Sequence, residues 1–421
     1  MAFVTLSKIQ IQQKTPYTPP GANEPIQRNS TFTLNFVISC EVESSWATLT
    51  DTAKITIPKN ITVTDQNGKK QNLGAGPGGI ATGAPIIAAN STQPPLFLRG
   101  DQITIYGGLG FKVNENPQAV YQQIFQGYIS GVKNKLPMEI ECEDNMWLLK
   151  QVLVPNQVWP EPMENAIGQM LSLVNNQKSV NFTLAPNPQS ITTNLGGLRT
   201  QDETMAQVVT RLQKDYKLEC FFRSDVLYIG TIVYYPNSNP INTFILERNI
   251  FPNHNLEYTR TDDINIALKA YSVNKLELQS TTKRGATKSK NTRLEVVVSN
   301  IDGKYRALTT NKDDQSKQSN SQMRTMYFWN ILTLSDLTQK AINMLHRFYY
   351  EGFRGSFTTL GLPFVQHGDQ VKIQSVRLPE WNGTYFVKSL KYSLGAGGFK
   401  QSIEIDLLSS IFTPEEIGQG I

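Results

Sequence analysis

Few side chains in this sequence are placed to carry chemistry. The chain has three histidines, His254, His346 and His367, and none lies in an H-E-x-x-H metal motif. No G-x-S-x-G nucleophile elbow is present either. Glu141, Glu143 and Asp144 could in principle form a carboxylate pair for glycoside hydrolysis. The alternate residues Glu141 and Glu143 share one strand face, roughly 7 Å apart. A solvated strand surface explains the same pattern, so we expect no enzyme and keep peptidoglycan hydrolysis as a minor alternative.

The sequence also offers little to a metal ion or a cofactor. Its three cysteines, Cys40, Cys142 and Cys220, lie far apart and form no C-x-x-C pair, which argues against a zinc site or a disulfide framework. The glycine-rich run at residues 74–79 lacks the Gly-Lys-Ser/Thr ending of a phosphate-binding loop. We therefore expect no metal, no cofactor and no bound nucleotide.

Composition limits the partners. The chain has 421 residues and a net charge of +5, from 40 basic and 35 acidic residues, which is small for a dedicated nucleic-acid binder. We expect no specific nucleic-acid binding. The basic run at residues 283–293 is interpreted as a solvated loop, with contact to phosphate or an acidic partner as the alternative. Only 18% of residues are charged, against roughly 25% in typical globular chains, and a neutral polar surface suits extensive protein contacts.

The sequence carries no sign of membrane insertion or export. No stretch approaches the ~18 consecutive apolar residues of a membrane span. The N-terminal residues lack the basic and apolar regions of a signal peptide, so we expect folding in a cytoplasm.

Hydrophobic periodicity predicts two β-rich ends. In residues 1–150, apolar residues alternate with polar ones in runs at 32–40, 55–57, 103–105 and 138–142. Residues 66–95 are rich in Gly, Ala, Pro and Asn and predict an insertion loop. Residues 256–421 return to β structure, with a polar insertion at 279–322 and a helix that begins at Ser335 as its N-cap.

The region between these ends has a different period. Residues 151–255 predict a small α+β domain with helices at 164–174 and 204–214. A tight hairpin follows at 223–225, between two short apolar runs.

The two β-rich ends resemble each other. Three pairs of segments match in the same order: 98–105 with 366–373, 125–130 with 382–387, and 138–142 with 402–406. The first pair shares a Gly-Asp turn, a Gln and an alternating strand. These matches predict an internal duplication, so that three chains can provide six equivalent positions in a ring.

The duplicated residues are the structural sites that we expect. Glycine permits a positive φ, and an aspartate after it can accept a backbone N–H and fix the turn. The expected turn and strand-start residues are Gly100, Asp101, Gly127, Tyr128, Gly368, Asp369, Gly383 and Tyr385. Replacing Asp101 or Asp369 with leucine should impair assembly more than any change at a histidine.

A family resemblance is carried by short motifs in both β-rich ends. They lie at residues 53–58, 97–101, 124–129, 142–150, 355–357, 361–363, 368–369, 383–385 and 397–401. These motifs resemble the hub proteins of phage tails and contractile injection systems, the class of late control protein D and the T-even baseplate hub. The resemblance implies a mainly β fold with α+β, in which two tube-like β-barrel modules related by internal duplication flank a small central α+β domain.

The same resemblance implies a structural role. Hub proteins of this class form a homotrimer whose pseudo-sixfold ring joins the hexameric tail tube to the trimeric central spike. The implied partners are the tail tube or a tube-initiator ring and the central spike protein, with the tape measure protein and baseplate wedge proteins as further candidates. The implied location is a virion tail baseplate or an injection-system particle, assembled in the host bacterial cytoplasm. Because the chain ends at Ile421, soon after its last predicted strand, we expect the spike to be a separate chain.

A glycan-binding adhesin module is the main alternative function. Beta domains with exposed aromatic side chains often bind glycans, and the candidates here are Trp159, Tyr234, Tyr235 and Trp381.

Overall fold

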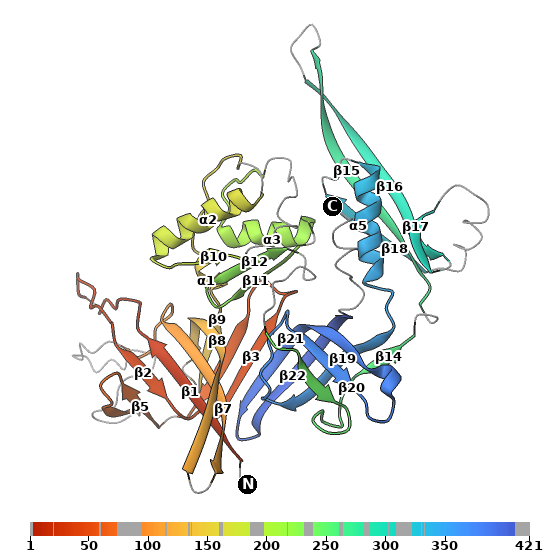
Figure 1. Ribbon diagram of the computed structural model, residues 1–421. Coiled ribbons are helices and arrows are strands. Elements are labelled where there is room, and N and C mark those ends of the chain that lie inside the picture. The colour runs from red at the N-terminus through yellow and green to blue at the C-terminus, as the bar shows by residue number, and fades with distance from the viewer. Residues whose placement is uncertain are drawn as a thin grey trace.

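The computed structural model describes residues 3–19, 21–58, 60–73, 95–113, 116–133, 135, 137–159, 163–185, 198–216, 218–230, 239–260, 264–281, 287–301, 303–308, 322–329, 331 and 333–408. Strands occupy far more of this part of the chain than helices do, which confirms the mainly β fold with a smaller helical part (Figure 1). None of the helices described in these ranges is long and apolar enough to cross a membrane.

The first β module is built from the N-terminal strands. They are β1 (Phe3–Gln12), β2 (Thr31–Leu34), β3 (Ser39–Ser45), β4 (Thr52–Ile57), β5 (Ile61–Asp65), β6 (Lys70–Leu73), β7 (Gln102–Val113), β8 (Asn116–Lys133) and β9 (Met138–Glu143). Alternation decides their faces: in β4, Ala53, Ile55 and Ile57 are buried while Lys54 is exposed. The strands predicted around residues 55–57, 103–105 and 138–142 are all present.

The run at residues 32–40 is not one strand, so this prediction was wrong. Strand β2 ends at Leu34 and pairs with β1 and β5, whereas β3 begins at Ser39 and pairs with β4. The chain changes partners between them, and Phe36 is 59% exposed there. An alternating pattern reports the period of a segment but not the strand beside which it lies.

The α+β unit follows the first module. Its elements are α1 (Met146–Leu149), α2 (Met163–Lys178), β10 (Thr183–Leu184), α3 (Met205–Tyr216), β11 (Glu219–Arg223) and β12 (Val226–Gly230). Strands β10, β12 and β11 form a three-stranded sheet, and Leu171, Val209 and Ile229 belong to one core with the helices. The predicted hairpin is confirmed, because Arg223 pairs with Val226 across a two-residue turn.

The second β module uses strands from two distant parts of the chain. They are β13 (Asn242–Ile245), β14 (Glu257–Thr259), β19 (Gly352–Leu360), β20 (Gln370–Gln374), β21 (Gly383–Gly395) and β22 (Gly398–Leu408), with the 3-10 helix η3 (Pro379–Trp381). Strand β13 pairs in parallel with β20, although its residues fall within the span 151–255 that was expected to form the α+β domain. The hydrogen bonds therefore place this segment with the second module.

The two β modules share one sheet and one core. Strand β21 pairs with β3, from Ser389 opposite Ser45 to Gly395 opposite Ser39, which makes a continuous sheet in the order β14-β19-β22-β21-β3-β4-β9-β8-β7-β1-β2-β5-β6. Buried residues of both modules form one hydrophobic cluster. At Gly107 an added Cβ would lie 2.7 Å from the ring of Phe399, so β7 and β22 approach closely.

A separate four-stranded unit interrupts the second module. It contains β15 (Ile266–Thr281), β16 (Thr287–Ile301), β17 (Lys304–Ala307), β18 (Gln322–Trp329) and α5 (Leu334–His346), with its own core. The predicted polar insertion at 279–322 therefore begins and ends in strands of this unit. Helix α5 is capped by Thr333, whose side chain accepts from the Asp336 N–H, and not by Ser335 as predicted.

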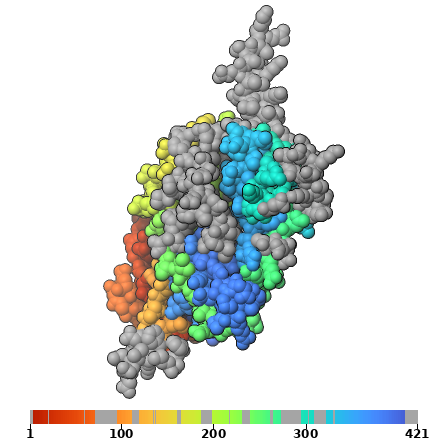
Figure 2. Space-filling model, turned by 45° about the vertical axis from the view of Figure 1, so that its right-hand side comes forward, coloured from red at the N-terminus to blue at the C-terminus, as the bar shows by residue number. Residues whose placement is uncertain are grey.

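The units have a consistent placement in two views. The α+β unit and the four-stranded unit lie on the same side of the two β modules, at the upper side in Figures 1 and 2. The β modules stand side by side below them.

Candidate functional site: the duplicated turns and the junction between modules

The first duplicated turn is tied to strand β8 by its backbone. Gly100 has a φ of +92°, a conformation that L side chains rarely adopt. Its N–H donates to the Ile129 carbonyl at 2.8 Å, and the Ile129 N–H donates to the Asp101 carbonyl at 2.9 Å. The Asp101 carboxylate accepts from the Leu98 N–H at 2.9 Å, while the Asp101 N–H donates to the Leu98 carbonyl at 3.1 Å.

The second duplicated turn has the same set of hydrogen bonds. Gly368 has a φ of +83° and donates to the Val387 carbonyl at 2.7 Å. The Val387 N–H donates to the Asp369 carbonyl at 2.8 Å. The Asp369 carboxylate accepts from the Gln366 N–H at 2.7 Å, and the Asp369 N–H donates to the Gln366 carbonyl at 3.1 Å. The two Gly-Asp turns thus hold their modules in the same local geometry.

The aromatic residues after the turns do not correspond as the sequence match suggested. Gln102 lies opposite Tyr128, and its counterpart Gln370 lies opposite Phe386, so Tyr128 corresponds to Phe386 and not to Tyr385. A shift of one residue turns a side chain to the other face of a sheet. Tyr128 accordingly packs in the core of the α+β unit, whereas Tyr385 packs in the core shared by the modules.

Gly127 and Gly383, the other two glycines of the expected set, are required for different steric reasons. An added Cβ at Gly127 would lie 2.1 Å from the Glu143 carbonyl oxygen, so this position excludes every other side chain. At Gly383 the nearest atom is the Tyr385 hydroxyl oxygen, at 2.7 Å, and this hydroxyl also accepts from the Phe353 N–H at 2.8 Å. These two glycines are therefore not counterparts.

The duplicated aspartates bind arginines from different elements. Arg28 lies in the first module and makes a bidentate ion pair with Asp101, at 3.0 and 2.9 Å, with both side chains almost fully buried. Asp369 instead binds Arg223, whose guanidinium lies 2.6 Å from Oδ1 and comes from the tip of the β11–β12 hairpin. Sequence matching could not find this pair, because the turn motif does not contain the arginine.

The same hairpin tip also contacts the first module. The Asn145 side chain donates to the Ser224 carbonyl at 2.6 Å and to the Asp225 carboxylate at 3.1 Å. Gln126 of β8 reaches Asp225 at 3.4 Å. The hairpin of the α+β unit therefore fastens both β modules at their junction.

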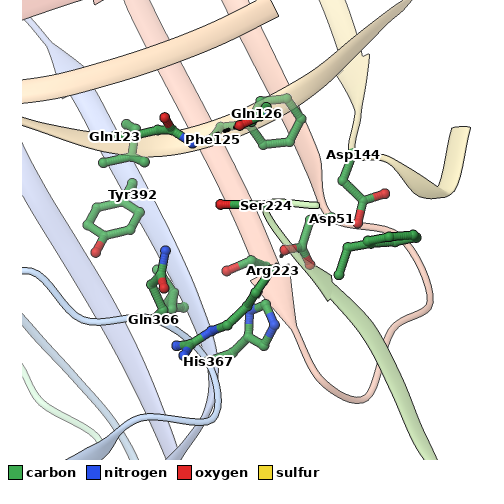
Figure 3. A pocket seen from close by; sticks show the side chains of 14 residues that line it. Asp51, Gln123, Phe125, Gln126, Asp144, Arg223, Ser224, Gln366, His367 and Tyr392 are labelled. Carbon is green, nitrogen blue, oxygen red and sulfur yellow. Dashed lines mark hydrogen bonds and ion pairs between the residues drawn. The ribbon is translucent and has the colours of Figure 1, made fainter. Parts of the chain in front are cut away.

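A small polar cavity lies at this junction (Figure 3). Its volume is about 60 Å³, enough for a few water molecules. The labelled side chains of Asp51, Asp144, Arg223 and His367 approach one another there from three different units of the fold.

His367 is almost fully buried at the cavity. It is 3% exposed, and within the described residues neither ring nitrogen has a hydrogen-bond partner. Its Nδ1 lies 3.8 Å from Asp51 Oδ2, beyond hydrogen-bond distance, and its ring packs edge-on against Phe221. Burial, with the nearby Arg223 charge, lowers the pKa of His367 to about 3, so the imidazole is neutral near pH 7.

The pKa values of the two carboxyls at the cavity are shifted upward, in the direction opposite to that of His367. Burial raises the pKa of Asp144 to about 7. Burial and the nearby Asp144 charge raise the pKa of Asp51 well above its usual value. Two carboxyls and an imidazole can exchange a proton, but substrate pockets span about 300–1,000 Å³, far more than this cavity offers. The arrangement fits a structural junction better than an active site.

A ladder of ion pairs covers one face of the continuous sheet in both modules, and we call this the polar face. Its pairs are Lys391 with Glu41 and Glu43, Lys388 with Glu404, Lys54 and Lys135 with Glu139, Lys133 with Glu141, and Lys150 with Glu143. The opposing charges lie close together, so this surface neutralises itself.

Of the three acidic residues considered for hydrolysis, Glu141 and Glu143 lie on this polar face, whereas Asp144 is buried and lines the junction cavity. Glu141 and Glu143 are each paired with a lysine. His254 accepts from the Leu256 N–H at 3.4 Å, and His346 packs against the Tyr305 ring at 3.9 Å. Glu141 and Glu143 are therefore held by lysines on the sheet surface, and of the three acids only Asp144 lies with a histidine, His367, at the cavity.

Trp159 and Trp381, the two candidate glycan-binding aromatics that the structure describes, do not form a platform. Trp159 is 3% exposed and donates from Nε1 to Thr200 Oγ1 at 2.8 Å. Trp381 stacks on Tyr258. Tyr234 and Tyr235 lie outside the described residues, as do residues 74–79, Lys283 and Arg284. Among the residues that are described, no cluster of His, Cys, Asp and Glu could hold a metal ion.

Comparison with known proteins identifies the fold. No protein-family model matches the sequence, and no curated protein matches it. The crystal structure of the tail protein from Neisseria meningitidis MC58 superposes with a TM-score of 0.56 at 13% identity, covering 96% of each chain. The 43 kDa tail protein of prophage MuSo2 from Shewanella oneidensis gives a TM-score of 0.48 at 9% identity, covering 96% of this chain and 98% of its own. The chain thus shares the fold of the Neisseria tail protein along nearly its whole length.

Proposed function

We propose that this chain is a structural hub of a phage tail or related injection particle. Three copies form a ring of pseudo-sixfold symmetry that joins a hexameric tail tube to a trimeric central spike. The fold shared with the Neisseria tail protein supports a place in a tail. The partners are the tail tube or its initiator ring on one side and the spike protein on the other, with tape measure and wedge proteins around them.

The observation that carries this proposal is the duplication of the Gly-Asp turns. Equivalent hydrogen bonds surround Asp101 and Asp369, so one chain presents the same strand arrangement twice. A closed ring of three such chains contains six similar modules, which matches a sixfold tube on one side and a threefold spike on the other.

The polar face supports a channel through the ring. A wall made of paired lysines and glutamates offers no excess positive charge to phosphates. A basic surface binds nucleic acid because lysines and arginines displace the counterions of the phosphates. A surface on which each lysine is paired with a glutamate does not displace them in this way. This face therefore suits passage of a polyanion without specific binding.

A non-enzymatic role agrees with the rest of the molecule. The cavity of about 60 Å³ at the junction is too small for a sugar chain or a peptide. The particle that contains the chain is a virion tail baseplate or an injection apparatus, assembled in the bacterial cytoplasm.

The decisive experiment is a mass measurement of the purified chain. Native mass spectrometry over a range of concentrations should show a trimer, and class averages from electron microscopy should show a ring with six lobes. A chain that stays monomeric at every concentration, alone and with its tube protein, contradicts the proposal. Loss of cell-wall turbidity on adding the purified chain would instead favour hydrolysis.

A further inference from the structure

The internal duplication assigns counterparts to the strands at the edges of the modules. Starting from Ile129 and Val387 beside the turns, each pairing register leads outward to the next strand. The counterparts in the first and second modules are Ile129 and Val387, Cys142 and Ile405, and Ala53 and Gly355. The residues one position before the last pair, Thr52 and Arg354, lie opposite Glu43 and Glu257, which are therefore counterparts as well. Strand β14 of the second module therefore occupies the place that β3 occupies in the first.

These two counterpart strands differ in what covers their outer edges. The outer edge of β3 is paired with β21, with Glu43 opposite Lys391 and Ser45 opposite Ser389. Strand β14 pairs with β19 on one side, and within the described ranges no strand pairs with its other side. An unpaired strand edge is a template for pairing with another chain.

The first module has the matching unpaired edge. Gly131, Val132 and Lys133 of β8 are the counterparts of Ser389, Leu390 and Lys391 of β21, because both strands carry the same register shift just after Ile129 and Val387. Strand β7 pairs with β8 only as far as Tyr128. Beyond that point, the side of β8 away from β9 has no strand partner among the residues that are described.

The charges at the two unpaired edges are complementary. Within the chain, Lys391 Nζ lies 3.0 Å from Glu43 Oε1. Their counterparts are again a lysine, Lys133, and a glutamate, Glu257. The Lys133 side chain is 54% exposed, and Glu257 is exposed at the sheet edge.

We propose that β14 of one copy pairs, antiparallel, with residues 131–133 of the next copy. The register places Glu257 opposite Lys133, Tyr258 opposite Val132 and Thr259 opposite Gly131. The contact repeats between copies part of the β3–β21 contact within each chain, and the three residues of β14 face three residues at the end of β8. This pairing rests on the proposed ring. A contact between two different surfaces of neighbouring copies leaves no edge unpaired only when the copies form a closed ring.

The register is tested by cysteine cross-linking. Residues opposite each other in an antiparallel pair have Cα atoms about 4.5–5.5 Å apart, within reach of a disulfide. The variant carrying Lys133→Cys and Glu257→Cys should form intermolecular disulfides under mild oxidation and run up to a trimer on a non-reducing gel. The single variants Lys133→Cys and Glu257→Cys are the matched controls and should not reach a trimer. The native Cys40, Cys142 and Cys220 are buried and should not contribute.

Charge reversal provides a test that needs no new cysteine. Lys133→Glu or Glu257→Lys should each raise the concentration at half-assembly at least about tenfold, because like charges opposite each other destabilise a strand pair at every contact of the ring. The chain with both changes should assemble at a lower concentration than the chain with Lys133→Glu alone, although the lost ion pair of Lys133 with Glu141 keeps it from full recovery. Lys391→Glu, which breaks the counterpart pair within the chain, should lower stability more than assembly.

The outcomes separate this inference from the proposed function. Suppose that the wild type is a trimer, that the doubly substituted chain gives no disulfide between positions 133 and 257, and that both charge reversals leave assembly unchanged. That result overturns the edge pairing while the ring stands. A chain that is monomeric under all conditions overturns both.

Discussion

The Arg223 guanidinium lies 2.6 Å from the Asp369 carboxylate, although the two residues are 146 positions apart in the chain. Asp101, the counterpart of Asp369, binds Arg28 of its own module instead. The two turns thus share a backbone geometry and differ in the arginine that neutralises the aspartate. The second turn depends on the α+β unit, and the first does not.

Asp101→Asn should destabilise the protein more than Asp369→Asn. Removing one charge of a fully buried pair typically costs about 3–5 kcal/mol, because the other charge remains desolvated. Arg223 is 15% exposed in its side chain, so water can solvate it after Asp369→Asn, and we expect about 1–3 kcal/mol there. Urea unfolding measures both free energies. Equal losses of unfolding free energy in the two variants would show that the different burial of the two ion pairs does not affect stability.

Arg223→Ala should loosen the β11–β12 hairpin from the second module without unfolding the first. Hydrogen exchange should accelerate at residues 219–230 and around the Gly368 turn, while the Gly100 turn keeps its protection. Arg248→Ala, at an exposed position, is the matched control. Acceleration at both turns alike would mean that the Arg223 contact does not act on the second module alone.

Asp144→Asn should flatten the decline of stability toward alkaline pH. The folded-state pKa of Asp144 is raised from 3.8 to about 7, so the folded protein binds its proton more tightly than the unfolded chain. This contribution is complete below pH 3.8 and is lost as pH rises through 7. Asparagine can still accept from the Met146 N–H and does not titrate. Urea midpoints at about pH 5 and about pH 8 should therefore differ less in the variant than in the wild type.

His367→Gln should reduce the loss of stability on the acid side of neutral pH. The folded-state pKa of His367 is lowered from 6.5 to about 3, so its contribution is present above pH 6.5 and is lost as pH falls toward 3. The variant cannot gain a proton on unfolding, and its stability should fall less between about pH 6.5 and about pH 4. His254→Gln serves as the control. An unchanged acid profile would indicate that His367 is already charged in the folded protein.

Gly127→Ala should destabilise the first module by several kcal/mol. The added Cβ would lie 2.1 Å from a backbone oxygen, which cannot move without breaking the β8–β9 pairing. Gly168→Ala in α2 is the matched control, because nothing lies within 4 Å of its added Cβ. That change should stabilise the protein by about 0.5–1 kcal/mol. Thermal unfolding of both variants gives the comparison.

The sequence predicted the features that depend on local chemistry. Gly100 and Gly368 precede aspartates, and this pair of residue types specifies the turn without help from distant segments. The hairpin after Arg223 and the buried faces of α2 and α3 followed from spacing in the same way. These signals lie within a few residues of the structure that they specify.

Features that depend on segments far apart in the sequence were not predicted correctly. Residues 32–40 alternate throughout, yet the chain changes strand partners around Phe36, and no local pattern records which strand lies alongside. The match of Tyr128 with Tyr385 aligned two aromatics, whereas the register set by the turns aligns Tyr128 with Phe386. The cavity at the junction brings together three segments, around Asp51, Asp144 and His367, whose proximity only the folded chain creates.

The β3–β21 pairing has a consequence for synthesis. The Ser45 side chain donates to the Lys388 carbonyl there, and the two residues are 343 positions apart, so β3 lacks its neighbour until the ribosome has added the residues between them. During that time the nascent first module exposes a strand edge that favours misassembly. A product of interrupted translation would keep this edge and be recognised by chaperones and proteases. Synthesis of β21 therefore removes the exposed edge of β3 at a late point in folding.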